Sequence, residues 1–240
     1  MSDLSQPILS ALAPTRGRAE SLRLSVDSLA PEKNGVEVLI WADDDDPQLD
    51  QYRKFFSNRY NTKLFVKPRV GYKNFHLMIN FLASQSSGDW LWLWNDDVYM
   101  GRTDWFGIFN SQAAQFKPRQ EPLVFNIQGE KNGFPILSRK YYEVLGHISG
   151  NTLCDYWTRR VVEGTDIHVH IPGIRPTHRK YGDDAKHGDL IDDTYRDVET
   201  LRARSRFFGS RSPSVSKAQL QDRAKIAHWL KRNKTTKAIL

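Results

Sequence analysis

Residues 90–98 read Trp-Leu-Trp-Leu-Trp-Asn-Asp-Asp-Val, an apolar run that ends in two adjacent acids. A run of this kind, preceded by Gly88, predicts a buried strand. Ligands of open α/β sheets bind outside the carboxyl ends of the strands, so this strand is expected to deliver Asp96 and Asp97 to the rim of a cleft. Adjacent carboxylates are hard oxygen ligands that suit Mg²⁺ or Mn²⁺. Asn-Asp-Asp also favours a plain polar turn, and both interpretations stay open.

The chain before this run alternates between strand and helix patterns. Strands are predicted at 6–13, 36–42 and 63–66, and helices at 19–29, 49–59 and 74–84. Residues 14–18 are expected to form a turn. Strands that alternate with helices predict an α/β, Rossmann-like fold with a mostly parallel central sheet. Periodicity does not define the order of the strands.

The chain after this run is less regular. Its predicted elements are a strand at 123–127, a strand-to-helix passage at 134–146, a helix at 154–163, a strand at 167–171, a linker at 202–214 and a basic amphipathic helix at 217–232.

The composition predicts a folded protein of a reducing compartment. Of 240 residues, 39% are hydrophobic, which is adequate for a core. The single cysteine, Cys154, rules out a disulfide within the chain, and we expect it to be buried rather than nucleophilic. No signal-peptide pattern and no apolar run of the ~18 residues that a transmembrane helix needs are present. A cytoplasmic location is the resulting expectation.

The net charge of +7 is concentrated near the C-terminus. Residues 201–240 hold 11 Lys and Arg against one acid, whereas residues 1–200 hold 24 against 27 acids. A basic tail predicts a polyanionic partner such as nucleic acid or a membrane surface. A solvated terminus without a partner is the alternative.

The glycine-rich phosphate loops of P-loop and dinucleotide-binding proteins are absent from the sequence. Four other motifs follow one another in a characteristic order. They are Pro-Thr-Arg-Gly-Arg at 14–18, acids at 43–46, Gly-Tyr-Lys-Asn at 71–74 before a helix with Asn80, and Asn-Asp-Asp-Val at 95–98. This order resembles that of nucleotide-sugar-dependent glycosyltransferases of the GT-A fold, in particular the family 2-like enzymes. The resemblance implies a GT-A catalytic domain over residues 1–200, followed by a basic linker and amphipathic helix over 201–240.

The resemblance also implies which side chains contact the nucleotide or its sugar. They are Pro14, Thr15, Arg18, Asp44, Lys73 and Asp96. Asp44 is our choice among Asp43 to Asp45 for the contact with the base or ribose, and four consecutive acids also suit a solvated turn. Lys73 has an alternative role as a surface lysine at a helix start.

The metal ligands that the resemblance implies are Asp97 and His178, for Mn²⁺ or Mg²⁺. The family pattern is Asp-x-Asp, but the first position here is Asn95, whose amide supplies no charge. The affinity for the metal is therefore expected to be lower than in family members that carry Asp at this position. A single histidine is more often structural than ligating, so both roles stay open for His178.

Asp155 matches the place where family members carry a catalytic carboxylate, at the start of a helix after a glycine. A general base is needed because an acceptor hydroxyl is a poor nucleophile until it loses its proton. Asp155 is our candidate; its alternative role is a helix-start acid stabilised by the dipole.

These inferences predict a metal-dependent glycosyltransferase that moves a sugar from a nucleoside-diphosphate donor to an acceptor hydroxyl, with inversion. The acceptor is left open between a glycan and modified DNA of the kind found in bacteriophages. The alternatives are a nucleotidyltransferase on a similar fold and a non-enzymatic nucleic-acid-binding protein. The latter is disfavoured because Trp90, Trp92 and Trp94 are expected in the core rather than at a stacking surface.

Overall fold

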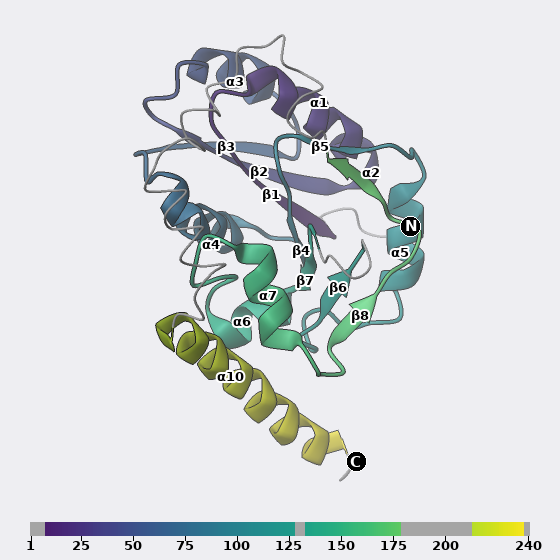
Figure 1. The fold of residues 1–240 in the computed structure, drawn as a ribbon. Helices are drawn as coiled ribbons and strands as arrows, with labels where there is room; N and C mark the ends of the chain where they lie inside the picture. The colour runs from purple at the N-terminus through teal and green to yellow at the C-terminus, as the bar shows by residue number, and fades with distance from the viewer. Residues whose placement is uncertain (1–7, 128–132, 179–212, 238–240) are drawn as a thin grey trace.

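A central sheet with helices on both faces organises the protein (Figure 1). The structure is a computed structural model that describes residues 8–127, 133–178 and 213–237. The strands of the central sheet in the described chain are β1 (Leu9–Thr15), β2 (Val36–Asp43), β3 (Thr62–Lys67), β4 (Trp90–Leu93), β6 (Val124–Asn126), β7 (Ile136–Ser138) and β8 (His168–His170). A separate two-stranded sheet pairs β5 (Val98–Met100) with β9 (Pro176–His178).

The strand order in the central sheet is β3-β2-β1-β4-β7-β6-β8. Strands β1 to β4 are parallel, and β6 is parallel to β8. Strand β7 is antiparallel to both of its neighbours, β4 and β6. The predicted α/β class with a mostly parallel sheet is confirmed, and the carboxyl ends of β1, β2 and β4 meet at one edge.

The helices follow the predicted alternation. They are α1 (Ala19–Leu29), α2 (Pro31–Asn34), α3 (Leu49–Phe56), the short 3₁₀ helix η1 (Tyr72–Asn74), α4 (Phe75–Gln85), α5 (Trp105–Ala113), α6 (Arg139–Leu145), α7 (Cys154–Val162) and α10 (Pro213–Lys237). Helices α1 and α3 lie on one face of the sheet and α4 on the other (Figure 1). Helix α1 has the predicted bounds and buries its predicted face of Leu22, Val26 and Leu29.

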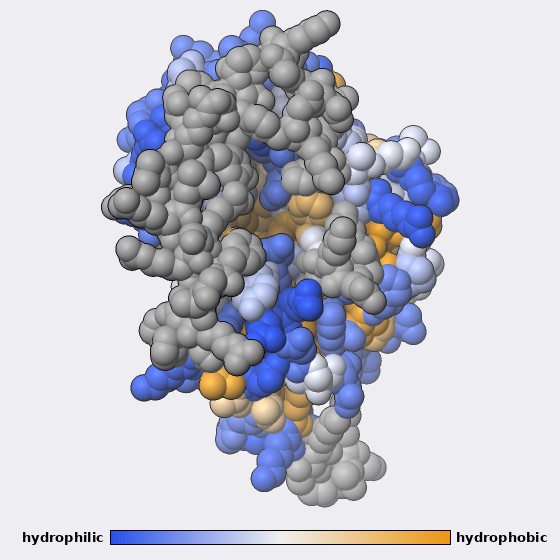
Figure 2. Space-filling view, viewed as in Figure 1, coloured by the Kyte–Doolittle hydropathy of each residue, from blue (hydrophilic) through white to orange (hydrophobic). Residues whose placement is uncertain are grey.

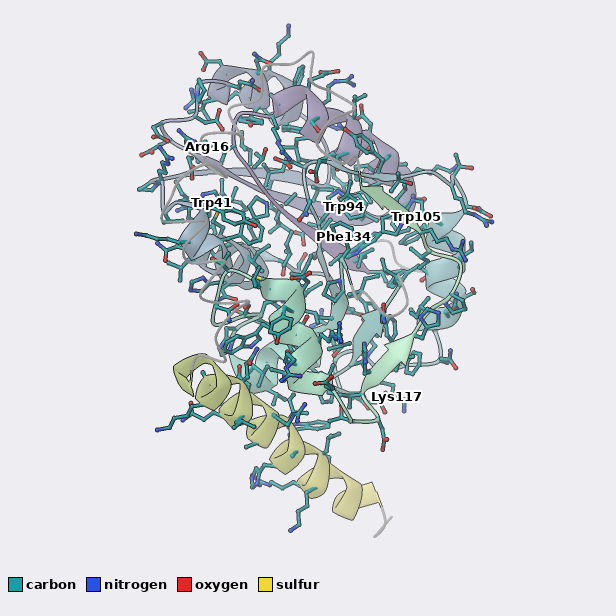
Figure 3. The ribbon with its side chains drawn as sticks, in the orientation of Figure 1. Arg16, Trp41, Trp94, Trp105, Lys117 and Phe134 are labelled. Atoms are coloured by element: carbon teal, nitrogen blue, oxygen red, sulfur yellow. The ribbon has the colours of Figure 1, made fainter. Side chains whose placement is uncertain are left out.

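The tryptophan run forms the centre of the core, as predicted. Trp90, Trp92 and Trp94 are 2%, 0% and 0% exposed. Trp92 packs against Trp94 and Trp105, with ring centroids 4.5 and 5.3 Å away. Figure 3 shows Trp94 beside Phe134 in the middle of the molecule, and their centroids are 6.4 Å apart. The tryptophan rings are buried and are not available as a stacking surface.

The prediction that residues 14–18 form a turn is wrong for the first two of them. Pro14 and Thr15 belong to β1, where they pair in register with Trp41 and Ala42 of β2. The strand therefore carries Thr15 to the sheet edge. Strands β5 and β9 and helix α5 are not among the elements predicted from the sequence pattern. Two of these are three residues long, too short for a periodic pattern, and form because they pair with each other.

Helix α10 packs against α6 and α7 rather than standing apart from the fold (Figure 1). It buries Asp222 and Ile226. The Nε1 atom of Trp157 donates to Asp222 Oδ2 at 3.2 Å, and His147 Nε2 lies 2.7 Å from the same oxygen. Residues 202–212 of the predicted linker lie outside the described residues, but its last two residues, Pro213 and Ser214, belong to α10, which is longer at both ends than the predicted helix at 217–232. The predicted division at residue 200 is untested, but α10 shares contacts with the domain before it.

Within the described ranges, no helix is long and apolar enough to cross a membrane. Figure 2 shows hydrophilic residues over much of the described surface on this side, with hydrophobic residues visible among them near the middle of the view. Cys154 is buried as predicted, and burial raises the pKa of its thiol to about 12.

Candidate functional site

Arg18 contacts both acids that follow β4. Its Nη1 atom lies 2.9 Å from Asp96 Oδ1 and 3.0 Å from Asp97 Oδ2. The Arg18, Asp96 and Asp97 side chains are only 14%, 11% and 19% exposed. Charges shielded from water to this degree interact more strongly than a surface ion pair. Fold topology thus joins the first and last of the sequence motifs in one cluster at the sheet edge.

Thr15 and Tyr52 support this cluster from β1 and α3. The Thr15 hydroxyl donates to Asp96 Oδ2 at 2.8 Å, and its oxygen lies 3.3 Å from the Tyr52 hydroxyl. The Arg18 backbone amide donates to the Tyr52 hydroxyl at 2.9 Å. From α1, the Ser21 hydroxyl donates to the Asp96 backbone carbonyl at 2.9 Å. Both the carboxylate and the main chain of Asp96 are therefore held in place.

The protonation of Asp96 depends on the cation beside it. Burial raises the pKa of Asp96 to about 6; Arg18 opposes this rise, and the charge of Asp97 adds to it. Burial would lower the pKa of Arg18, but the charges of Asp96 and Asp97 outweigh burial and raise it. Arg18 is thus always a cation, and it stabilises an acid pair whose like charges repel each other.

The four acids after β2 divide into structural and exposed residues. Asp43 accepts from Arg16 Nη1 at 3.1 Å, and Asp46 accepts from the Gly17 backbone amide at 2.8 Å. Asp43 and Asp46 are 1% and 5% exposed, so they shape the loop after β1. Asp44 is exposed, and its backbone amide donates to the Lys67 carbonyl at 2.8 Å. Its predicted contact with the nucleotide stays a prediction.

The turn that carries Lys73 contacts the loop that leads to Asp155. The Thr152 hydroxyl donates to the Tyr72 carbonyl at 2.9 Å and also contacts the Lys73 carbonyl. Asn80 Nδ2 donates to the Ser149 carbonyl at 2.8 Å, and Asn80 Oδ1 accepts from the Ser149 amide at 3.2 Å. Lys73 itself is exposed. Asn80 thereby joins α4 to the segment that precedes α7.

Asp155 lies in the first turn of α7 and is exposed. Desolvation by surrounding protein atoms raises the pKa of its carboxyl, while backbone amides of the same turn lower it. An accessible carboxylate with a raised pKa suits proton transfer, but the same position suits an acid that interacts with the helix dipole. Both roles predicted for Asp155 remain compatible with this geometry.

Pairing of two strands brings the backbone of His178 close to that of Asp97. Strand β9 pairs antiparallel with β5, so that His178 is opposite Val98, the residue after Asp97. The His178 side chain lies outside what the structure describes. In the part of the chain that is described, no three His, Cys, Asp or Glu residues are grouped to hold a metal.

The donor set fits a divalent cation that takes few ligands from the protein. The acid pair already holds a cationic group, the Arg18 guanidinium, at hydrogen-bonding distance from both carboxylates. Mg²⁺ in phosphate-transfer sites is commonly held by one or two carboxylates, with phosphate oxygens and water as the other ligands. Asp97 and Asp96 can fill that role without a three-residue protein cage.

The structure also contains site-supporting residues that sequence reasoning missed. Tyr52, Asp46 and Ser21 each bond to the segments that carry the predicted residues. Tyr52 lies in the predicted helix at 49–59, but no local pattern indicates that its hydroxyl reaches the loop after β1. A cavity of about 330 Å³ lies elsewhere, and it is lined by Asn126, Arg159, Glu163, Gly164 and His168. None of these residues belongs to the predicted site.

Solved structures with a similar backbone include glycosyltransferases. One is the mannosyltransferase PcManGT from Pyrobaculum calidifontis in complex with GDP-Man and Mn²⁺, with a TM-score of 0.54, 14% identity, and coverage of 99% of this chain and 81% of that one. Another is TarS 1–349 from S. aureus in complex with UDP, with a TM-score of 0.53, 12% identity, and coverage of 95% and 91%. This chain has the GT-A fold. The predicted fold family is thereby confirmed.

A third GT-A structure supports the same assignment. Glucosyl-3-phosphoglycerate synthase from Mycobacterium tuberculosis, in complex with Mn²⁺, UDP and phosphoglyceric acid, has a TM-score of 0.51 and 14% identity, with coverage of 83% of this chain and 78% of that one. No protein-family model matches the sequence. No curated protein matches it either. The GT-A assignment therefore depends on the similarity of the backbone, because the sequence identities to these structures are only 12–14%.

Proposed function

We propose that this GT-A protein is a metal-dependent glycosyltransferase that moves a sugar from a nucleoside-diphosphate donor to an acceptor hydroxyl. The observation that carries the proposal is the acid pair Asp96–Asp97 at the carboxyl edge of the sheet, held together by Arg18. Ligands of α/β sheets bind at this edge. The structures with Mn²⁺ and GDP-Man or UDP, which share the fold, support the same ligand classes here.

The donor is proposed to bind across the ends of β1, β2 and β4. Pro14, Thr15 and Arg18 border the nucleotide from the β1 side, and Asp44 contacts its base or ribose from the β2 side. Lys73 lies near the diphosphate. Asp96 contacts the sugar or ribose, while Asp97 and His178 bind Mn²⁺ or Mg²⁺. The register of β5 with β9 supports the last pairing, because it brings the His178 backbone beside Val98.

The chemistry requires charge neutralisation and a base. When bound, the divalent cation neutralises the charge that develops on the departing nucleoside diphosphate. Arg18 is a protein cation within hydrogen-bonding distance of both acids. Asp155 accepts the proton of the acceptor hydroxyl, and direct attack on the sugar carbon inverts the anomeric centre.

The acceptor is proposed to be a polymer that carries hydroxyl groups, either a glycan or modified DNA of the bacteriophage type. The exposed part of α10 favours a polyanionic acceptor, because the single acid of residues 201–240, Asp222, is buried. Lys217 is exposed on this helix, and Lys225, also exposed, pairs with Asp222 at 3.3 Å. Replacement of the exposed α10 lysines Lys217 and Lys231 by glutamine keeps the buried Asp222 and Ile226 in place, and it is expected to weaken salt-sensitive DNA binding if α10 serves this acceptor.

A cytoplasmic location is part of the proposal and is supported by the single, buried cysteine. Fractionation of cells that express the full chain tests it, and recovery of the protein outside the cytoplasm would contradict it.

The first test is a thermal-shift screen of nucleoside diphosphates and nucleotide sugars with and without Mn²⁺. A ligand at 100 times its Kd stabilises the folded state by about 2.7 kcal/mol, so a metal-dependent shift for one nucleotide identifies the donor class. Asp97→Ala is expected to remove the metal-dependent shift and sugar transfer. Asp50→Ala is the control, because Asp50 is 95% exposed on α3 and pairs only with Arg53 of the same helix.

The products distinguish the alternatives. Release of a nucleoside diphosphate supports the proposal, whereas release of pyrophosphate indicates a nucleotidyltransferase. Tight DNA binding without any nucleotide-dependent shift would favour a non-enzymatic nucleic-acid-binding protein.

A further inference from the structure

Arg18 occupies the position between Asp96 and Asp97 at which both carboxylates converge on one cation. A single nitrogen, Nη1, donates to an oxygen of each acid, at 2.9 and 3.0 Å. The other arginine of the same loop, Arg16, pairs with Asp43 and Asp45 after β2 instead. The loop after β1 therefore contributes two arginines to two different acid clusters, and Arg18 is the one that reaches Asp97, a proposed metal ligand, together with Asp96.

We propose that the Arg18 guanidinium and a divalent cation compete for the Asp96–Asp97 carboxylate pair, and that the displaced guanidinium pairs with the donor diphosphate. The first part concerns the protein and metal alone. The second part depends on the proposed function, since it requires a nucleoside diphosphate in the site.

The charge count of the cluster favours this exchange. Two carboxylates and one guanidinium leave one net negative charge, so a divalent cation alone is both attracted by the acids and repelled by Arg18. Once a diphosphate enters, it supplies several negative charges, and both cations have partners. A guanidinium also matches phosphate oxygens in a bidentate manner that a lysine does not reproduce.

The backbone allows Arg18 to change partner without loss of the fold. Its main-chain amide is bonded to Tyr52, and the following residue, Ala19, is buried at the start of α1. The side chain is fixed only by its contacts with the two acids, as far as the described hydrogen bonds define it. When Arg18 leaves the two acids, Asp96 keeps the Thr15 hydroxyl as a donor.

Binding of Mn²⁺ without nucleotide tests the first part. The EPR signal of free Mn²⁺ is titrated with wild-type protein, Arg18→Gln and Arg16→Gln. Removing a positive charge this close to the metal is expected to tighten Mn²⁺ binding at least about tenfold in Arg18→Gln. Arg16→Gln removes the same charge from the same loop and is expected to leave the Mn²⁺ affinity unchanged. Equal or weaker Mn²⁺ binding by Arg18→Gln would overturn the proposal.

Chemical modification of the wild-type protein covers the case in which Arg18→Gln does not fold. Phenylglyoxal reacts with accessible arginines, and peptide mapping reports Arg18 and Arg16 separately. Mn²⁺ is expected to speed modification of Arg18 and not of Arg16. A rate for Arg18 that Mn²⁺ leaves unchanged or lowers would contradict competition between the two cations.

Binding of UDP and of GDP in the presence of Mn²⁺ tests the second part. Arg18→Gln is expected to weaken the nucleotide that binds by about tenfold, the opposite direction to its effect on Mn²⁺ alone. Unchanged nucleotide affinity in Arg18→Gln would overturn the transfer of Arg18 to the diphosphate. If the wild-type protein binds neither nucleotide, the proposed function fails, while the Mn²⁺ titration still decides the competition.

Discussion

Replacement of Asp222 by alanine is expected to destabilise the whole protein rather than only its C-terminal helix. Asp222 is 3% exposed and joins α10 to two other parts of the chain. Its Oδ2 accepts from Trp157 Nε1 of α7 at 3.2 Å and lies 2.7 Å from His147 Nε2 after α6. Lys225 of α10 contacts the other oxygen at 3.3 Å.

The loss of unfolding free energy in Asp222→Ala combines the contributions of the three contacts that Asp222 makes. Trp157 is buried, and an indole N–H left without an acceptor costs about 1–3 kcal/mol. The His147 contact, with that side chain 28% exposed, adds about 1 kcal/mol. Lys225 is 50% exposed, so its contact adds no more than about 0.5 kcal/mol. The higher helix propensity of alanine offsets about 0.5 kcal/mol. The free energy of unfolding is expected to fall by about 2–4 kcal/mol.

Urea unfolding followed by tryptophan fluorescence measures this loss at pH 7. Gln221→Ala is the matched control, because Gln221 is the preceding residue of α10 and is exposed, and its effect is expected within about 0.5 kcal/mol of zero. A loss below about 0.5 kcal/mol for Asp222→Ala would refute the docking of α10 through Asp222. An early transition confined to α10, with the rest unchanged, would also refute it.

Three further perturbations test other parts of the structure. Gly88→Ala places a Cβ 2.6 Å from Ser10 Oγ and 2.9 Å from the Ser10 backbone nitrogen, so the free energy of unfolding measured in urea is expected to fall by about 2–4 kcal/mol. The control is Gly107→Ala, whose Cβ meets no atom within 4 Å and which is expected to be neutral or stabilising. Equal effects of the two substitutions would be inconsistent with this packing. Because desolvation raises the pKa of Asp155, the sugar-transfer rate is expected to fall as the pH decreases, with a midpoint above the ordinary value of ~3.9. Asp155→Asn is expected to lower kcat by about 10²–10⁴ and to remove this acidic fall in rate. An acidic fall that persists in Asp155→Asn would exclude Asp155 as the base. Burial raises the pKa of Asp222, but hydrogen bonds from His147 and Lys225 outweigh burial and lower the pKa in the folded state. The difference in unfolding free energy between Asp222→Asn and the wild type is therefore expected above about pH 4 and is expected to vanish as the pH falls below that value. A difference that grows in acid would contradict this pKa shift.

The local pattern of the sequence determined much of the sheet and its helices. Helix α1 has the bounds that its apolar spacing predicts, and the tryptophan run is buried as its continuous apolar character indicates. These features follow from local propensity and from the need to bury one face, which a single segment expresses by itself. The resemblance of the four motifs likewise predicted the GT-A fold, which the backbone comparison then confirmed.

The short elements depended on partners that lie far along the chain. Strands β5 and β9 have three residues each and exist through their mutual pairing. Pro14 and Thr15 read as turn residues, but register with β2 places them in β1. Helix α5 had a usable signal, since Trp105, Phe109 and Ala113 recur at helical spacing and are buried.

In the candidate site, too, some features follow from the local sequence and others depend on the tertiary structure. The sequence by itself determined that acids and basic residues follow the strands, because polar side chains end each apolar run. Only the tertiary structure decided that Arg18 contacts both Asp96 and Asp97, across 78 and 79 positions of sequence, and that the Tyr52 hydroxyl holds the Arg18 backbone. The physical reason is that parallel strands bring their carboxyl ends to one edge whatever their separation in the chain, and no local pattern encodes which strands become neighbours.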